Sequence, residues 1–148
     1  MTWKPHVTVA AIIEDHNQFL MVEEIIDGKK LINQPAGHLE ANESLVDAVI
    51  RETREETTRD FQAEFLVGVY QWTHPDQTAF LRFTFAGSCG PADKTRKPDP
   101  DIHSSGWMSL DDIHALSDSH RSPLVMQSLQ DYLQGCHYPL DLLSDLSG

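Results

Sequence analysis

The chain has few cysteines and no long apolar run, and each shortage excludes a class of protein. Its two cysteines, Cys89 and Cys136, have no metal-ligand spacing and can both stay unpaired, which favours a reducing, cytoplasmic setting. No apolar run approaches the roughly 20 residues that a membrane-spanning helix needs. The segment from Met1 to His6 lacks the basic and apolar regions of a signal peptide. We therefore expect a cytoplasmic protein without a membrane anchor.

Basic residues are also scarce, with 11 Lys and Arg against 23 Asp and Glu and a net charge of -12. This negative charge disfavours binding to nucleic-acid polymers and to anionic membranes. An acidic protein can still bind phosphorylated small molecules if metal ions bridge the two. The length of 148 residues suits one domain with a real core, so we expect residues 1–148 to form a single domain, as a monomer or homodimer.

Runs of apolar residues predict strands on both sides of one helix. The nearly continuous β-branched run from His6 to Ile13 is typical of a strand buried on both faces. Residues 34–38 are expected to form a loop, and residues 90–100 a longer one that acts as a lid or as an edge of the substrate site. The further strands are expected at residues 18–24, 30–33, 60–72, 79–86 and 102–108.

Helix-start signals occur three times. Asn42 or Ser44 is expected to cap a helix that ends near residue 58, and Ser109 to open a second. Ser122 is expected to cap a third, with Pro123 at its first helical position. The tail from residue 139 to 148 is expected to be weakly structured. Together these elements predict an α+β fold, a mixed sheet covered by helices.

The most informative segment runs from residue 37 to 59 and combines carboxylates with an apolar stripe. At about 100° per residue, one helix face would carry Leu45, Val49, Glu52 and Glu56, with Ala48 and Glu55 on its flank. Such carboxylates repel one another and are costly to bury without compensation. A hard divalent cation is the natural compensation. The alternative is a solvated acidic helix face, and helix spacing alone leaves both open.

The wider spacing of this segment resembles the signature box of the Nudix hydrolases, G-x5-E-x7-R-E-U-x-E-E-x-G-U with U aliphatic. The matching residues are Gly37, Glu43, Arg51, Glu52, Glu55 and Glu56. Three positions depart from the box, because Thr53 and Arg59 stand at aliphatic positions and Thr58 stands at the glycine. The resemblance implies an α/β/α sandwich in which the box forms a loop-helix-loop. It extends to Trp107–Leu110, which is similar to the family's last strand and the helix after it.

The resemblance also implies a chemistry. Nudix enzymes hydrolyse a nucleoside diphosphate linked to another group, usually by water attack on phosphorus, with Mg²⁺ or Mn²⁺. By matching positions, Glu55 and Glu56 would be the principal metal ligands, helped by the carbonyl of Gly37. Glu52 would bind a metal or deprotonate the attacking water, and Arg51 would hold Glu52 in place.

Residues outside the helix would complete this site. Glu40 is expected to join the metal shell or the substrate contacts, and Glu43 to play a structural part by pairing with Arg51. Family members often supply a further acid from outside the box, and here Asp101 is the first candidate and Asp99 the second. The alternative is that both only solvate a Pro-rich loop. His38 either contacts phosphate or is incidental.

Other segments resemble one subgroup of the family, bacterial phosphatases that release phosphate from nucleoside tri- and diphosphates and thiamine-related pyrophosphates. These segments are Lys4–Ala10, Asn33–Glu40, Gln71–Trp72, Phe80–Phe83 and Arg121–Val125. The similarity implies a small pyrophosphorylated substrate, with hydroxymethylpyrimidine or thiamine pyrophosphate among the candidates. Trp72 would stack on a base or belong to the core. The residues expected to meet phosphates are Arg82, or Lys94, Arg96 and Lys97 of the long loop.

Two other functions compete with a hydrolase. A non-catalytic Nudix domain that senses a nucleotide usually loses box carboxylates, and this chain keeps all of them. A simple acidic interaction module would leave the Gly37 to Glu56 spacing unexplained. The sequence therefore predicts a metal-dependent hydrolase of phosphoanhydride bonds.

Overall fold

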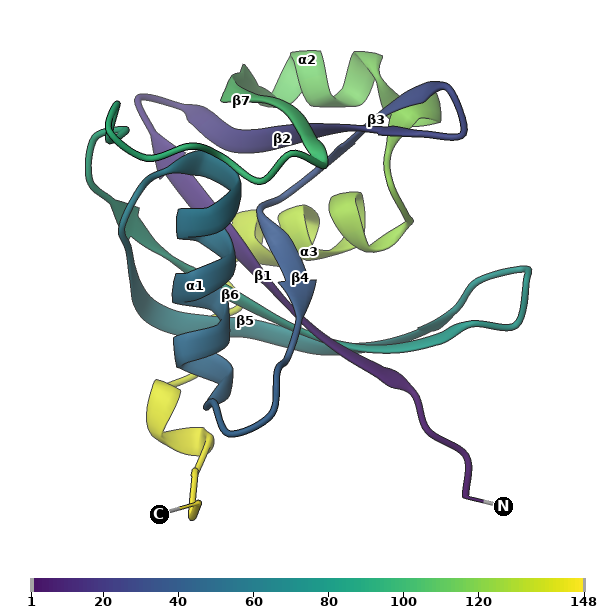
Figure 1. Cartoon of the computed structure of the whole chain (residues 1–148), viewed down its shortest axis with the longest axis vertical. Coiled ribbons are helices and arrows are strands. Elements are labelled where there is room, and N and C mark those ends of the chain that lie inside the picture. The colour runs from purple at the N-terminus through teal and green to yellow at the C-terminus, as the bar shows by residue number, and fades with distance from the viewer. Residues whose placement is uncertain (1, 148) are drawn as a thin grey trace.

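The computed structural model describes residues 2–147, which form a seven-stranded mixed sheet with helices on both sides (Figure 1). The strands are β1 (His6–Asp15), β2 (Gln18–Ile26), β3 (Lys29–Asn33), β4 (Ala36–His38), β5 (Phe61–Thr73), β6 (Ala79–Cys89) and β7 (Ile102–Ser109). The main path has the order β3-β2-β1-β6-β5, while β4 pairs with β1 and β7 with β2. The pair β1 and β6 is parallel, and the other pairs are antiparallel.

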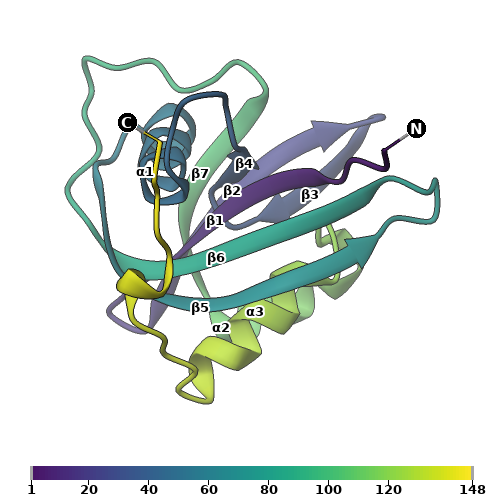
Figure 2. The same ribbon diagram turned by 90° about the horizontal axis from the view of Figure 1, so that it is seen from below.

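The helices lie in two layers. They are α1 (Leu45–Thr57), α2 (Leu110–Ala115) and α3 (Leu124–Leu133), with short 3-10 turns η1 (Ser117–Ser119) and η2 (Leu140–Leu142). α1 lies on one side of the sheet, and α2 and α3 lie on the other (Figure 2). None of the helices within residues 2–147 has the length and apolar character that crossing a membrane requires. The predicted α+β fold, an α/β/α sandwich, is confirmed.

Strand β1 supplies both layers of the core. Its residues from Val9 to Ile13 are all buried, which confirms the expected strand with two covered faces. Because side chains alternate along a strand, Val9, Ala11 and Ile13 pack toward α1, and Ile12 packs toward α3. The sheet therefore forms a rigid platform between two apolar layers.

Two expectations about chain ends and loops are wrong. Residues 36–38, expected in a loop, form β4, in which Gly37 pairs with Val9 of β1. Three residues are too few to show the alternation that marks a strand in a sequence. The tail also has more order than expected, because Tyr138 exchanges backbone hydrogen bonds with Leu66 at 2.8 and 2.9 Å and η2 follows. Leu140 packs on the core cluster beside α1, although residue 148 lies outside the described part.

The helix caps largely follow the sequence signals. Of the two candidates for α1, Ser44 is the cap, and its Oγ accepts a hydrogen bond from Asp47 N at 3.0 Å. Ser109 caps α2 in the same way through Asp112 N at 3.1 Å. At α3 the boundary differs by one residue, because the helix begins at Leu124 and Pro123 precedes it. Ser122 Oγ nevertheless accepts from Leu124 N at 3.1 Å.

The long loop, residues 90–101, is fastened to the carboxyl end of α1. Asp99 N donates to the carbonyl of Glu55 at 2.7 Å, and Asp93 N donates to Thr58 Oγ1 at 3.1 Å. Arg96 Nη1 donates to Asp60 Oδ1 at 2.9 Å. Of the two roles considered for this loop, a fixed edge of the site fits these contacts better than a lid.

Candidate active site

The acidic helix turns two of its carboxylates inward and one outward. The side chain of Glu56 is buried and that of Glu52 is only 13% exposed, whereas that of Glu55 is 45% exposed. The predicted stripe of Val49, Glu52 and Glu56 is therefore present, with Glu55 on its flank. The inward carboxylates face a pocket rather than the apolar core.

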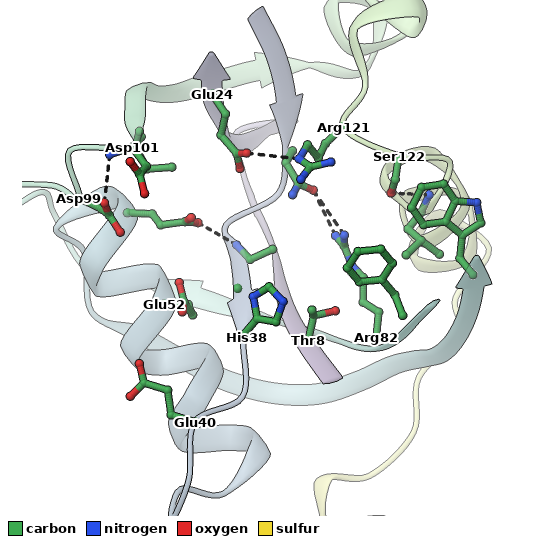
Figure 3. Close-up of a pocket in the computed structure, with 18 residues that line it drawn as sticks. Thr8, Glu24, His38, Glu40, Glu52, Arg82, Asp99, Asp101, Arg121 and Ser122 are labelled. Atoms are coloured by element: carbon green, nitrogen blue, oxygen red, sulfur yellow. Dashed lines mark hydrogen bonds and ion pairs between the residues drawn. The ribbon is translucent and has the colours of Figure 1, made fainter. Parts of the chain in front are cut away.

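This pocket has a volume of about 400 Å³ and two chemically different walls (Figure 3). In Figure 3, Asp99, Asp101, Glu52 and Glu40 lie on one side, and Arg82, Arg121 and Ser122 lie on the other. The carboxylates in the lining are Glu24, Glu40, Glu52, Glu56, Asp99 and Asp101. The aromatic and basic side chains in the lining are His38, Trp72, Phe80, Arg82 and Arg121.

Most of the residues expected in the site meet in this pocket. Those that line it are Gly37, Glu40, Glu52, Glu56, Trp72, Arg82 and Asp101, together with the second candidates His38 and Asp99. Arg51 and Glu55 do not line it, although Arg51 contacts both Glu52 and Glu55. The loop cations Lys94, Arg96 and Lys97 do not line it either, so the expectation that they meet phosphates there finds no support.

Two lining residues were missed by the sequence reasoning. Glu24 comes from β2, where an acid follows a run of apolar residues, and Arg121 comes from the segment before α3. Arg121 opens one of the segments that resemble the phosphatase subgroup, so a signal for it existed. No spacing in the sequence links either residue to the box.

Arg51 holds the carboxylates behind the pocket in place. Its Nε and Nη2 donate to both oxygens of Glu43, at 3.0 and 2.7 Å, which is the predicted structural pairing. Its Nη1 donates to Glu52 Oε1 at 2.8 Å and to Glu55 Oε2 at 3.2 Å. Hydrogen bonding to Arg51 lowers the pKa of Glu43. Arg51 is thus positioned to orient Glu52, as expected from the box.

Gly37 is required by the close approach of Glu52. A methyl group on Gly37 would overlap the carboxylate of Glu52, with all three atoms of that group in the way. Gly37 is not among the described residues with positive φ, so close approach, rather than unusual backbone geometry, explains the glycine. The backbone of β4 and the Glu52 carboxylate therefore share one narrow space at the edge of the pocket.

Burial disfavours the ionised form of the Glu56 carboxyl group. Burial raises its pKa to about 9, even though Ala36 N donates a hydrogen bond to Oε1 at 2.8 Å. Burial also raises the pKa of Glu52, and the charge of Asp99 adds to both effects. Asp101 acts instead on Glu24. Of the two candidate acids outside the box, Asp99 is therefore the one that lies electrostatically closer to the box carboxylates.

Arg82 is buried beneath the wall opposite the acids. It is 4% exposed, and its Nη2 donates to Gln34 Oε1 at 2.8 Å. Longer contacts of 3.4 Å join it to Asn33 Oδ1, and its buried Nε has no hydrogen-bond partner within residues 2–147. Burial lowers the pKa of Arg82 to about 10. Arg82 therefore contributes positive charge under the pocket more than an open phosphate contact.

Aromatic and imidazole rings border the wall of the pocket that lies opposite the carboxylates. Trp72 stacks on Phe80 with centroids 5.7 Å apart, and Phe80 contacts His6 at 5.5 Å. His6 Nδ1 and His38 Nε2 lie 3.0 Å apart, so a residue without a predicted role orients the pocket histidine. Trp72 is half-buried and lines the pocket, which gives it a free edge or face for a planar ligand.

The three residues that depart from the box pattern are accommodated by their local surroundings. The hydroxyl of Thr53 is buried and donates to the carbonyl of Val49 at 2.8 Å. Thr58 adopts the left-handed conformation that the box glycine would take, with φ of 64°. Arg59 lies over the ring of Trp107 at 5.3 Å from its centroid. None of these positions touches the inward carboxylates, so the departures leave the acid arrangement intact.

The donor set of the pocket suits a divalent metal ion. Six carboxylates line the pocket, and the two inward ones are destabilised by burial, which a cation would relieve. Among residues 2–147, no three His, Cys, Asp or Glu side chains converge enough to hold an ion by themselves. Mg²⁺ is commonly held by one or two carboxylates plus waters and substrate phosphates. Glu52, Glu56 and the Gly37 carbonyl fit that pattern.

Known proteins match this chain over nearly its whole length. A family model described as NUDIX domain matches residues 4–128. Phosphatase NudJ of Escherichia coli (strain K12) is 46% identical over 145 residues, which cover 98% of this chain and 94% of that protein. The solved structure of a NUDIX hydrolase from Nitrosomonas europaea is 48% identical, with a TM-score of 0.95, covering 98% of this chain and 99% of the other.

More distant structures share the fold alone. A MutT NUDIX hydrolase from Burkholderia pseudomallei has a TM-score of 0.74 at 19% identity, covering 87% of this chain and 98% of its own. Enzymes of this family generally use a divalent metal ion, which agrees with the donor set of the pocket. The box, the sandwich and these matches lead to one conclusion: the chain belongs to the Nudix hydrolase family, as an enzyme that hydrolyses a pyrophosphate bond.

Proposed function

We propose that the protein releases orthophosphate from a small pyrophosphorylated compound in the presence of Mg²⁺ or Mn²⁺. The candidates are nucleoside di- and triphosphates and hydroxymethylpyrimidine or thiamine pyrophosphate. The observation that carries this proposal is the pocket itself, in which most of the carboxylates lie on one side, and Arg82 and Arg121 lie on the other with Trp72 beside Arg121. Such a division suits a ligand with phosphates at one end and a planar ring at the other.

The roles follow from the positions of the side chains. Glu52, Glu56 and the Gly37 carbonyl would hold the cation, with Asp101 or Asp99 as a further ligand. Glu55 would join them only after its side chain turns from Arg51 toward the pocket. When bound, the cation neutralises phosphate oxygens and stabilises charge that develops in the transition state. Arg51 keeps Glu52 oriented, and Glu52 can take a proton from the attacking water.

The organic part of the substrate belongs at the other wall. Trp72 would stack on its ring, and Glu40 would border the phosphates near the mouth of the pocket. The similarity to Phosphatase NudJ supports an enzyme over a nucleotide sensor. A panel of nucleotides tested for phosphate release with and without Mg²⁺ separates these alternatives, since a sensor would bind without turnover. Cytoplasmic location and a monomeric or homodimeric state stay predictions.

Labelled water tests which phosphorus is attacked. A nucleoside diphosphate should give the monophosphate and orthophosphate, because in this proposal the terminal phosphoryl group binds beside the carboxylates. Water attacks that phosphorus, and the bridging oxygen leaves with the monophosphate. In ¹⁸O-water the label should therefore appear in orthophosphate. Label in the monophosphate, or release of intact pyrophosphate from a triphosphate, would contradict terminal attack and leave only the general family activity.

Metal should also stabilise the protein without substrate. The inward carboxylates destabilise the metal-free pocket, and an ion that binds only the folded state adds stability by mass action. At a free metal concentration of 100 times Kd the gain would be about 2.7 kcal/mol. Thermal melts in EDTA and in millimolar Mg²⁺ measure it, with Ca²⁺ as a second cation. Identical melting curves across the titration would count against a site that exists before substrate binds.

A further inference from the structure

The carboxylates of the pocket repel any phosphorylated ligand. Six carboxylates line it, and a substrate with two phosphates brings several more negative charges. A metal ion at the acid wall can neutralise the phosphoryl group that is transferred. The phosphate that stays on the product lies farther from that wall, so it needs a cation of its own.

Two cations of the described chain line the pocket, and their exposure separates them. The guanidinium of Arg82 is nearly buried and is used by Gln34 and Asn33. The side chain of Arg121 is 38% exposed and stands on the wall opposite the acids (Figure 3). Arg121 is therefore the cation that an entering anion can reach.

The backbone around Arg121 is held firmly, while its guanidinium is held loosely. Arg121 N donates to the carbonyl of Ile32 at 2.8 Å, and the neighbouring His120 pairs with Ile32 and bonds Ile113 through its ring. The structure gives the guanidinium one ion pair, from Nε to Glu24 Oε2 at 3.5 Å. That distance exceeds the 2.7–3.2 Å of a good N–H···O bond. The outer nitrogens of the fork are thus available for a bidentate contact.

We propose that Arg121 binds the phosphate that remains on the organic product. This inference rests on the proposed function and assigns the second phosphate of that substrate. The terminal phosphate lies at the acid wall, the inner phosphate lies at Arg121, and the ring lies on Trp72, which borders the same surface as Arg121 and Ser122. The monophosphate product keeps its contact with Arg121 after the terminal group has left.

The test compares Arg121→Gln with Lys29→Gln, which removes the same charge from an exposed position of β3 that does not line the pocket. For a nucleoside diphosphate, Arg121→Gln should raise KM about 10- to 100-fold, the range for losing a hydrogen bond to a charged group. It should change kcat much less. The dissociation constant of the nucleoside monophosphate, measured by calorimetry with Mg²⁺, should rise by a similar factor. Lys29→Gln should leave both constants near those of the parent protein.

Two further variants separate direct contact from an indirect effect. Arg121→Lys keeps the charge but loses the forked guanidinium, so its KM and dissociation constant should fall between those of the parent protein and of Arg121→Gln. If Arg121→Gln fails to fold, Arg121→Lys is measured in its place. Glu24→Gln removes the partner of Arg121. If Arg121 only positions Glu24, Glu24→Gln will reproduce the Arg121→Gln kinetics and monophosphate binding will not change. That result, or equal constants for Arg121→Gln and Lys29→Gln, overturns the assignment.

The same measurements distinguish failure of this inference from failure of the proposed function. A parent protein that releases no phosphate from any diphosphate contradicts the proposed function, and calorimetry with the monophosphate still tests Arg121. An active parent protein whose monophosphate affinity is insensitive to Arg121 contradicts this inference alone.

Discussion

Replacing Glu56 with Gln should remove turnover and leave the fold intact. The amide keeps the size of the side chain, and its oxygen can still accept the hydrogen bond from Ala36 N. It loses the negative charge that would bind the cation. Because a bound metal provides several kcal/mol of transition-state stabilisation, the expected fall in kcat is at least about 1,000-fold. Phosphate release under saturating Mg²⁺ measures it, and near-normal turnover would show that Glu56 is not a ligand.

The same variant should be more stable than the parent protein when metal is absent. Burial raises the pKa of Glu56 from 4.5 to about 9, so folding takes up a proton between these values. A group with a raised pKa makes the folded state lose stability as pH rises through that window. Gln does not titrate, so Glu56→Gln should escape this loss. Melting temperatures in EDTA from pH 5 to pH 9 should therefore diverge, with the variant higher by several degrees above pH 7.

Glu64→Gln provides the matched control for charge. Glu64 is exposed on β5 and does not line the pocket, so the control should follow the parent protein at every pH. If Glu56→Gln and Glu64→Gln behave alike in EDTA, the charge of Glu56 is not destabilised by its surroundings. The electrostatic reason for a metal at this position would then be lost.

Gly37→Ala should disable the enzyme by a purely steric route. The added methyl group would overlap the Glu52 carboxylate, so either that carboxylate leaves its place or β4 moves away from the helix. Both changes disturb the ligands that would hold the cation. Displacement of a reacting group by about 1 Å can cost roughly 100-fold in rate, and we expect a loss of kcat of at least that size. Metal affinity, measured by the melting temperature in a Mg²⁺ titration, should weaken as well.

Gly106→Ala is the control for a glycine in a strand. Gly106 lies in β7, and a methyl group there would have nothing within 4 Å. This variant should keep both activity and metal-dependent stability. Unchanged activity in Gly37→Ala would mean that Glu52 can move without consequence, which would contradict its place in the site.

The acid half of the site could be predicted from the sequence, whereas the opposite half could be predicted only in part, through Trp72 and Arg82. Helical periodicity places Glu52 and Glu56 on one face because their spacing lies within a single rigid element. Glu24 and Arg121 come from distant segments, and only the pairing of β2 with β1 and β3 and the contact of residue 121 with Ile32 bring them to the pocket. The proximity of residues that are far apart in the sequence depends on sheet topology, which local sequence patterns do not encode.

The directions of individual side chains also could not be predicted from the sequence. Periodicity puts Glu55 on the flank of the stripe, and its contact with Arg51 turns the carboxylate outward. Likewise, an arginine in an alternating strand gives no sign that it is buried, yet Arg82 finds Gln34 and Asn33 beneath the pocket. The order of the candidates Asp99 and Asp101 also depends on the loop's attachment to α1.

That attachment has a consequence for how the molecule opens. A β-branched residue is strained in the left-handed conformation, which Thr58 adopts. The hydroxyl of the same side chain accepts a hydrogen bond from Asp93 N. With Asp99 bound to Glu55, the last turn of α1 and the loop from residue 90 to 101 form one cooperative unit. Their amide protons should exchange with solvent together, through a single local unfolding event that removes Asp99 and frays the carboxyl end of the catalytic helix at the same moment.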